Sequence, residues 1–481
     1  MRHLKFGLVF IARLIAACLL PFGLVPAQDL VKGKIVENVV CLADSGQSYA
    51  LYLPSAFDRG TKRPILFLFD PGARGPIAVE AFRDAAETCG WILVGSNNSS
   101  NGPIADSARA ARAIWADAID RLPIDGRRIY ASGFSGGSRV ASLFPRIIGR
   151  MIAGVIGCGA GLSSGVKPGD LKGAAYFGLA GLADFNYGEM KNLDRSFDPS
   201  GVPHRILFFE GVHAWPDPAL CARAVGWMEV VAMKGGLRPK DEKLLEGFVG
   251  RELDEARSFE DAGRVYWAVD RLEAVRSMAG GFHEIPDLAV RIQALKARKE
   301  YGQFLKDEKK RDRETSDFRL AIGRTFGMIE RNEAGGEAVR QALRDMGISF
   351  LKKKAKAGKT VEDRSLASRL LADLSSAAQD RAGALIEKGG LAEAAAYLDL
   401  AIAACEEGLF RQKYVYFNRA VVAVLAGDKK GALEFLSEAV DKGLTDIDLL
   451  ENVKALDPVR DTDRFREIVE KARNAGQSEK R

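Results

Sequence analysis

Histidine is scarce in this chain. Among 481 residues there are four, so few positions can supply an imidazole for acid–base chemistry. Cysteine is also rare, with six residues. No strong excess of one charge exists either, because 70 basic residues stand against 64 acidic ones. The net charge of +6 is too mild to indicate a nucleic-acid partner. Beyond the first 27 residues no stretch is apolar enough to predict a membrane span.

The first 27 residues have the three parts of a secretory signal peptide. A basic start is followed by an apolar body over residues 6–20 and by Val25-Pro26-Ala27. We therefore expect cleavage before Gln28 and a periplasmic or secreted protein. A lipoprotein box at Ile15-Ala16-Ala17-Cys18 and an uncleaved anchor are the alternatives. The first is disfavoured because the apolar run continues beyond Cys18 and is interrupted by Arg13, and the second because the run is short and interrupted. The mature chain keeps an odd number of cysteines, so at least one cannot pair within the chain.

The remainder divides into two regions of different pattern. Over residues 28–240 short β-prone runs alternate with helical ones, which predicts a mostly parallel sheet with covering helices. Over residues 241–481 strand-like runs vanish and helical periodicity takes over. We therefore expect an α/β domain followed by an all-helical domain.

The segment Gly133-Phe134-Ser135-Gly136-Gly137 lies where a β-prone run, residues 128–132, gives way to a helical one, residues 139–144. In a strand–turn–helix context, Gly-x-Ser-x-Gly is the pattern of a nucleophile elbow, since the glycines remove the Cβ atoms that would clash in the tight turn. Without that context the motif is most often an ordinary loop. The pattern makes Ser135 the candidate nucleophile.

A serine nucleophile needs a base, and elimination leaves one good histidine. His3 lies in the leader and His283 in the helical region. His204 precedes the apolar run 206–209, whereas His213 follows it. Since the sites of parallel sheets form at the carboxyl ends of the strands, we expect His213 to be the base.

The orienting acid should follow the preceding strand. The run 175–181 is β-prone and Asp184 lies three residues beyond it. With the serine and the histidine, Asp184 completes the chain order nucleophile, acid, base. The alternative is that Asp184 is a surface turn residue, with Asp194 and Asp198 as rival acids.

Three segments carry a family resemblance: residues 128–137, 181–187 and 210–216. Over residues 35–236 the chain resembles the α/β-hydrolase superfamily, in particular its esterases of the polyhydroxyalkanoate depolymerase-like and feruloyl esterase-like branch. The resemblance implies that Ser135 is acylated, His213 shuttles the proton and Asp184 orients the imidazole. Esterases of this branch often carry a tryptophan two residues after the histidine, so Trp215 is expected to contact substrate. We expect an ester substrate, small or polymeric, with no cofactor and no metal.

The expected oxyanion loop departs from the family pattern. Where these esterases commonly have His-Gly, this chain reads Asp70-Pro71-Gly72-Ala73. Pro71 has no N–H, so we expect the amide of Gly72 or Ala73 to face that of Gly136. The alternative is that residues 70–72 form a plain turn.

Two further features lie near this predicted edge of the sheet. The loop 96–103 leaves a strand end on the same edge as Ser135, so Asn97 and Asn98 are expected to line the substrate cleft, with an exposed polar loop as the equal alternative. For Arg74 we favour a solvated side chain over a partner for an acidic substrate.

The helical region contains a degenerate repeat. The pattern Gly-x4-Ala-x3-Leu-x2-Val/Ala starts at Gly263, Gly389 and Gly427, and it resembles tetratricopeptide repeats. Such repeats present extended surfaces, so a protein partner is expected there. Residues 28–240 alone are expected to fold and to hydrolyse small esters.

The function predicted from these patterns is an exported serine hydrolase of carboxylic esters. A repeat-based interaction protein with a degenerate hydrolase domain is the alternative. A peptidase of the same superfamily differs only in its leaving group.

Overall fold

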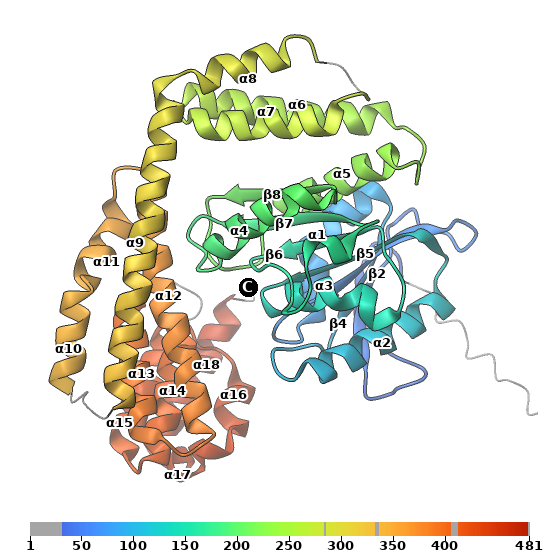
Figure 1. Cartoon of the computed structure of the whole chain (residues 1–481). Helices are drawn as coiled ribbons and strands as arrows, with labels where there is room; N and C mark the ends of the chain where they lie inside the picture. The colour runs from blue at the N-terminus through green and yellow to red at the C-terminus, as the bar shows by residue number, and fades with distance from the viewer. Residues whose placement is uncertain (1–30, 283–284, 332–335, 406–411, 480–481) are drawn as a thin grey trace, which may run out of the picture.

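The structure is a computed structural model that describes residues 31–282, 285–331, 336–405 and 412–479. The predicted signal peptide and its cleavage site lie outside the described residues. The chain forms an α/β part followed by an all-helical part, as Figure 1 shows. Among the described helices, none is long and apolar enough to cross a membrane.

Eight strands form one sheet in the order β1-β2-β4-β3-β5-β6-β7-β8. The first two strands pair antiparallel, β2 pairs antiparallel with β4, and the other pairings are parallel. The strands are β1 (Ile35–Val40), β2 (Ser48–Tyr52), β3 (Arg63–Phe69), β4 (Ile92–Ser96), β5 (Ile124–Phe134), β6 (Gly154–Cys158), β7 (Ala175–Gly181) and β8 (His204–Phe209). This is the α/β-hydrolase fold, as predicted.

Helices cover both faces of the sheet. One face packs against α1 (Gly75–Cys89) and α5 (Pro218–Lys234), and the other against α2 (Ile104–Arg121), α3 (Gly136–Ile148) and α4 (Tyr187–Phe197). Because alternate strand residues face opposite sides, β3 sends Leu66 and Leu68 into one core and Phe67 into the other. Burial on both faces explains why the central strands are continuously apolar.

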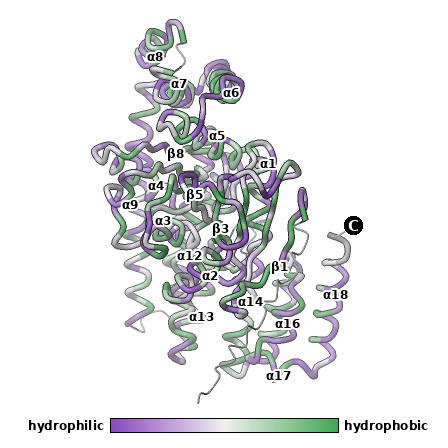
Figure 2. The backbone as a smooth tube through the Cα atoms, turned by 90° about the vertical axis from the view of Figure 1, so that its right-hand side faces the viewer, coloured by the Kyte–Doolittle hydropathy of each residue, from purple (hydrophilic) through white to green (hydrophobic). Residues whose placement is uncertain are grey.

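The first core does not end at residue 240. Leu245 and Phe248 of α6 (Glu242–Asp261) and Val275 and Met278 of α7 (Val265–Ala279) pack into the same cluster as α1 and α5. The helices α6 and α7 therefore cover the α5 side of the sheet, at the upper end of the molecule in Figure 2. The predicted boundary thus cuts through a shared core, which conflicts with the expectation that residues 28–240 fold alone.

The remaining helices turn around one side of the α/β part. After α8 (Leu288–Lys296), the helix α9 (Lys299–Glu330) runs down beside the sheet to the rest of the helical part (Figure 1). The later helices are α10 (Gly336–Asp345), α11 (Ile348–Ala357), α12 (Val361–Ile386), α13 (Leu391–Ala404), α14 (Gln412–Leu425), α15 (Lys429–Asp441), α16 (Ile447–Asn452), α17 (Asp457–Arg460) and α18 (Asp463–Glu479).

Each predicted repeat copy coincides with a helix pair: α6 with α7, α12 with α13, and α14 with α15. Gly263, Gly389 and Gly427 lie in the connecting turns with φ of +71°, +79° and +85°, a conformation that favours glycine. The apolar residues of the pattern, such as Ala432 and Leu436, are buried in the second helix of each pair. The region between α8 and α12 interrupts the series, so the pairs do not form one continuous stack. Membership of the tetratricopeptide family stays a prediction.

Candidate functional site

Ser135 lies at the tight turn between β5 and α3. Its backbone has φ 55° and ψ −118°, in the positive-φ range that a non-glycine residue rarely adopts. The neighbouring glycines make this turn possible. A Cβ on Gly133 would lie 2.2 Å from the carbonyl oxygen of Gly137, and a Cβ on Gly137 would lie 1.9 Å from that of Phe69. The sequence motif therefore forms the sharp elbow for which its glycines are suited.

The structure brings Ser135, His213 and Asp184 into one hydrogen-bonded chain. His213 Nδ1 lies 2.8 and 2.9 Å from the two carboxylate oxygens of Asp184, and its Nε2 lies 2.9 Å from Ser135 Oγ. An ionised carboxylate only accepts hydrogen bonds, so Nδ1 carries the proton and Nε2 is free to accept that of the serine. Asp184 is buried, and two aromatic rings, Phe134 and Phe185, lie 4.6 and 4.1 Å from the imidazole centroid. These surroundings hold the imidazole and limit the access of water.

The rival residues lie elsewhere. His204, at the start of β8, has Nδ1 3.0 Å from the carbonyl oxygen of Val202 and Nε2 3.6 Å from Asp198. Asp194 lies on α4, where burial raises the pKa of its carboxyl group to about 6. None of these three groups forms part of the chain of hydrogen bonds at Ser135.

The loop after β3 is built around the buried carboxylate of Asp70. Its Oδ1 accepts hydrogen bonds from the Gly72 amide and from Arg74 Nε, both at 2.8 Å. Its Oδ2 accepts from Arg74 Nη2 at 3.0 Å and from Trp215 Nε1 at 2.8 Å. Arg74 is thus a bidentate partner of Asp70, and this ion pair raises the pKa of the guanidinium. The Arg74 side chain is 39% exposed, so it is partly solvated as the sequence favoured, but it is paired with Asp70 rather than free.

This loop also changes the oxyanion prediction. The Gly72 amide donates to Asp70 Oδ1, and the Ala73 amide donates to the Asp70 carbonyl oxygen at 3.1 Å. Both predicted donors are therefore engaged within their own loop, because the Asp70 side chain and backbone compete for their N–H groups. The Gly136 amide is different. It begins α3, where an N–H has no acceptor within the helix.

Asn101 was not singled out from the sequence, although it lies in the loop 96–103 that was expected at the same edge as Ser135. Its backbone amide donates to the carbonyl oxygen of Pro71 at 2.8 Å, which joins its loop to the Asp70 loop. A Cβ on Gly136 would lie 1.8 Å from Asn101 Oδ1, so the Asn101 carboxamide lies directly against the elbow. Only the close approach of two loops identifies it, since no motif includes it.

Asn97 and Asn98, which were predicted to contact the substrate, have a structural role instead. Asn97 Nδ2 donates to the Glu37 carbonyl oxygen at 3.0 Å and to Ser48 Oγ at 3.2 Å. Asn98 Oδ1 accepts from the Ser48 amide at 2.8 Å, and its Nδ2 donates to the Gly46 carbonyl oxygen at 3.2 Å. These side chains fasten the loop to β1, β2 and the turn between them. The prediction that they line the cleft is wrong because three of their four polar side-chain atoms bond to those strands or to the turn, and Asn97 Oδ1 lies against Gly75 at the start of α1.

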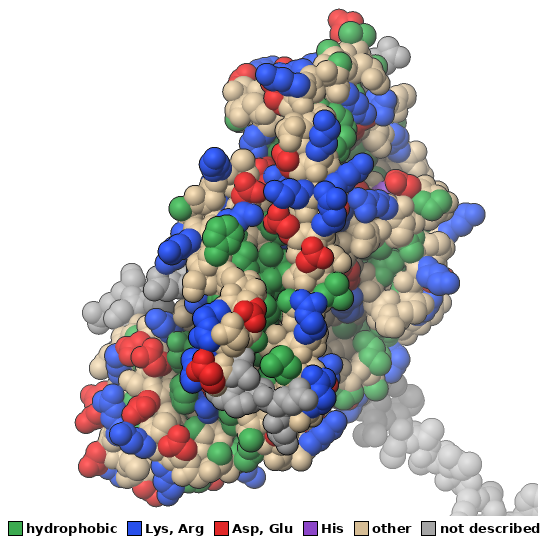
Figure 3. Space-filling model, turned by 60° about the vertical axis from the view of Figure 1, so that its left-hand side comes forward, with side chains coloured by type: hydrophobic (Ala, Val, Ile, Leu, Met, Phe, Trp, Pro, Cys, Tyr) green, Lys and Arg blue, Asp and Glu red, His purple; other side chains and the backbone are tan. Residues whose placement is uncertain are grey.

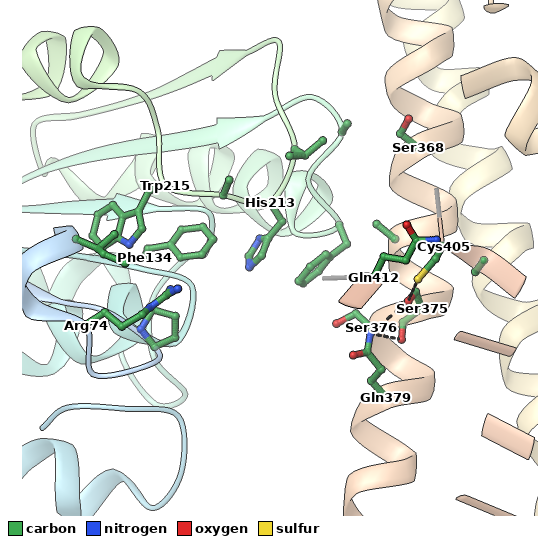
Figure 4. Close-up of a pocket in the computed structure, with 18 residues that line it drawn as sticks. Arg74, Phe134, His213, Trp215, Ser368, Ser375, Ser376, Gln379, Cys405 and Gln412 are labelled. Carbon is green, nitrogen blue, oxygen red and sulfur yellow. Dashed lines mark hydrogen bonds between the residues drawn. The ribbon is translucent and has the colours of Figure 1, made fainter. Parts of the chain in front are cut away.

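A cavity of about 350 Å³ lies beside His213, between the two parts of the chain. Residues of the α/β part, among them Phe134, His213 and Trp215, form one side. Residues of α12, α13 and α14, among them Ser376 and Gln412, form the other, as Figure 4 shows. The site is therefore not confined to residues 28–240, contrary to expectation. Trp215 lines the cavity, although its Nε1 hydrogen is already donated to Asp70.

The helical part also holds the loop that carries Asp184. Arg369 of α12 is buried, and its Nη1 donates to the Leu182 carbonyl oxygen at 2.8 Å. The same guanidinium lies 4.2 Å from the ring centroid of Tyr187, whose hydroxyl donates to Glu308 of α9 at 2.9 Å. The helical part therefore contacts the loop both before and after Asp184, at Leu182 and at Tyr187.

Charged pairs reinforce this junction. Lys191 of α4 contacts both Glu308 and Asp312 of α9 at 2.7 Å. On the face shown in Figure 3, basic and acidic side chains are interspersed over the helical part, with hydrophobic side chains between them. Lys191 and Glu308 are largely buried, whereas Asp312 is exposed and its pair contributes little. Arg369 is also buried and bonds directly to the loop that carries Asp184. Within the described ranges, no cluster of three His, Cys, Asp or Glu side chains is placed to hold a metal ion.

No protein-family model matches the chain, and no curated protein matches it. Among solved structures, it is similar to a ferulic acid esterase at 16% identity and a TM-score of 0.35, over 40% of this chain and 97% of that one. An esterase of Pyrobaculum calidifontis aligns at 13% identity and a TM-score of 0.34, over 42% and 87%. Thermogutta terrifontis esterase 2 phosphonylated by cyclosarin aligns at 13% and 0.33, over 40% and 91%. Likeness at this level leaves the function to be inferred from the site.

Proposed function

We propose that this chain is an exported serine hydrolase that cleaves carboxylic esters through an acyl-enzyme. The observation that carries the proposal is the continuous hydrogen-bonded chain from Ser135 Oγ through the His213 imidazole to the buried Asp184 carboxylate. A serine in a strained elbow with a base at 2.9 Å has the arrangement required of an activated nucleophile.

In the proposed reaction, Ser135 Oγ attacks the carbonyl carbon of the ester while His213 Nε2 takes the hydroxyl proton. The tetrahedral intermediate then collapses, the bond to the alcohol oxygen breaks, and His213 returns the proton to the leaving alcohol. Water next attacks the acyl-enzyme and gives a proton to the same nitrogen. Collapse of the second intermediate transfers that proton to Ser135 and releases the acid. Asp184 stabilises the imidazolium in both steps.

For the developing oxyanion we propose two donors, the Gly136 amide and the Asn101 carboxamide. Gly136 directly follows the nucleophile in the chain, and the Asn101 carboxamide lies against Gly136. Rotation of the carboxamide by 180° exchanges its oxygen and its NH2 group, so Nδ2 can be presented to an anion at this place.

A fluorophosphonate probe tests the activity directly, since it labels only a serine activated by its base. We expect the mature protein to be labelled at Ser135 and to hydrolyse short p-nitrophenyl esters. An unlabelled but folded protein would favour the alternative, an interaction protein with a degenerate hydrolase domain, for which the occupied amides of the Asp70 loop are the supporting observation. Parallel assays on matched esters and amides separate esterase from peptidase.

Export is part of the proposal and rests on the leader sequence alone. Its test is the N-terminal sequence of protein recovered from the periplasm or medium, which we expect to begin at Gln28. A protein partner for the helical part remains a prediction, to be tested by co-purification.

A further inference from the structure

The cavity beside His213 has two chemically different walls. The wall from the α/β part is apolar, with Pro71, Ile77, Phe134, Phe185, Val212 and Trp215 around the imidazole. The wall from the helical part carries hydroxyl and carboxamide groups instead. Its polar members are Ser368, Ser375, Ser376, Gln379 and Gln412. Figure 4 shows the two sets facing each other across the cavity.

Four of these five polar residues lie on one face of α12, and Gln412 lies at the start of α14. Ser368, Ser375 and Gln379 recur at helical spacing and line the cavity, whereas Leu370 and Leu374 on the other side of the helix are buried in the helical core. The face that meets the α/β part is therefore not a continuation of the hydrophobic core. A polar face directed at a cavity takes its hydrogen-bond partners from the water or ligand that fills it.

Part of the hydrogen-bonding capacity of this wall is unused. Gln379 Nε2 donates to Ser375, to its carbonyl oxygen at 3.1 Å and to its Oγ at 3.2 Å. Gln412 is only 7% exposed and lines the cavity, yet within the described residues its carboxamide makes no hydrogen bond. Its polar atoms are therefore open to the cavity, where a ligand that donates to them or accepts from them can replace water.

The cavity offers no net charge to a ligand. No acidic side chain lines it, and Arg74 is its one permanently charged lining residue. Because Nε and Nη2 of Arg74 form a bidentate ion pair with the buried Asp70, that charge is already compensated. A charged ligand would lose its hydration without gaining a counter-ion.

From these walls we infer the substrate class: an uncharged ester that is apolar next to the ester carbonyl and carries a hydroxyl or amide group at its far end. The apolar part lies against Phe134 and Trp215, and the polar end reaches the α12 wall and Gln412. A volume of about 350 Å³ is within the range of small-ligand sites. The inference rests on the proposed function and assigns the helical part a direct role in specificity.

The test uses p-nitrophenyl esters of equal chain length that end in a methyl, an acetamide, a carboxylate or an ammonium group. We expect kcat/KM for the acetamide ester to exceed that of the methyl ester about tenfold and that of either charged ester by more. In Gln412→Leu and Gln379→Leu the ratio of acetamide to methyl ester should fall about fivefold or more. The matched control is Gln341→Leu, on the exposed surface of α10, which should leave the ratio unchanged.

The ratio is insensitive to the fraction of folded enzyme, so a partly unfolded variant still reports on specificity. A wild-type ratio at or below one, or a ratio unmoved in both variants, overturns the inference. In either case fluorophosphonate labelling of Ser135 still supports the proposed hydrolase. An absence of labelling in folded protein overturns the proposed function itself, and the inference with it.

Discussion

The two parts of this chain contribute differently to the candidate site. In the α/β part, the three candidate catalytic residues follow β5, β7 and β8, with β6 between the first two, and the sheet is buried on both faces. The helical part contributes none of these three residues. It supplies instead the second wall of the cavity and a hydrogen bond to the loop that carries Asp184. Under the proposed function, the reacting groups lie on the buried sheet and the helices line the space that a substrate would occupy.

The largest effect should come from the α/β part. We expect Ser135→Ala and His213→Ala each to lower kcat by about 10⁴-fold or more. The nucleophile and its base act as one unit, so the loss of either removes most of the rate enhancement of both. His204→Ala is the matched control and should stay close to wild type, since His204 is bonded to Val202 outside the site. The hydrolysis rate of p-nitrophenyl acetate and the extent of fluorophosphonate labelling are measured for all three variants. Comparable losses in the two histidine variants would contradict the assignment of the base.

Truncation compares the parts directly. We expect residues 28–240 to unfold without cooperativity, because α6 and α7 are missing from the first core. Residues 28–282 keep those helices and should unfold cooperatively, but with ester turnover well below that of the full protein, since α12 and Arg369 are absent. Thermal unfolding and turnover of the three proteins provide the measurement. Full activity in residues 28–282 would show that the helical part is dispensable for chemistry.

Asn101 tests the proposed oxyanion donor. Asn101→Ala should lower kcat about 10²-fold with little change in KM, since the interaction develops in the transition state. Asn98→Ala, on the same loop, is the control. It loses bonds to Ser48 and Gly46, so it should lower Tm and leave kcat in place. Equal kcat in the two variants would remove Asn101 from the site.

Arg369 tests whether the helical part positions the acid. We expect Arg369→Ala to lower kcat about tenfold, to leave KM for p-nitrophenyl acetate unchanged and to shift the pH profile of kcat, because the Leu182 carbonyl loses its donor next to Asp184. Arg369→Lys should recover part of kcat, since an ammonium group can also donate to that carbonyl. A loss of Tm with an unchanged kcat and pH profile would make the contact purely structural.

The smallest effect is expected at Trp215. Trp215→Phe keeps an aromatic ring in the cavity and removes the hydrogen bond to Asp70, a contact worth about 1.5–3 kcal/mol when its acceptor is charged. We expect Tm to fall by about 3–6 °C and KM to rise modestly, with kcat nearly unchanged. A large fall in kcat would instead link the Asp70 loop directly to the oxyanion.

Several features followed from local sequence patterns. The α/β-hydrolase fold and the all-helical second part are confirmed, because alternating apolar runs and helical periodicity are properties of short segments. His213 could be chosen over His204 from the direction of one strand, because His213 follows its carboxyl end and His204 precedes it. The convergence of Ser135, Asp184 and His213 needed only the rule that parallel strands end at one edge.

What the sequence determined by itself was the order of the elements and the residues that end each strand, since backbone sterics and side-chain periodicity act within a few residues. The bonds from the Gly72 and Ala73 amides to Asp70 are equally local, two and three residues apart, and form the plain turn that was the alternative for residues 70–72. The tertiary structure alone decided that Asn101 faces the elbow and that α12 closes the cavity. Such contacts join residues far apart in the chain, such as Leu182 and Arg369. Their partners are selected by the packing of whole elements, which no local pattern records.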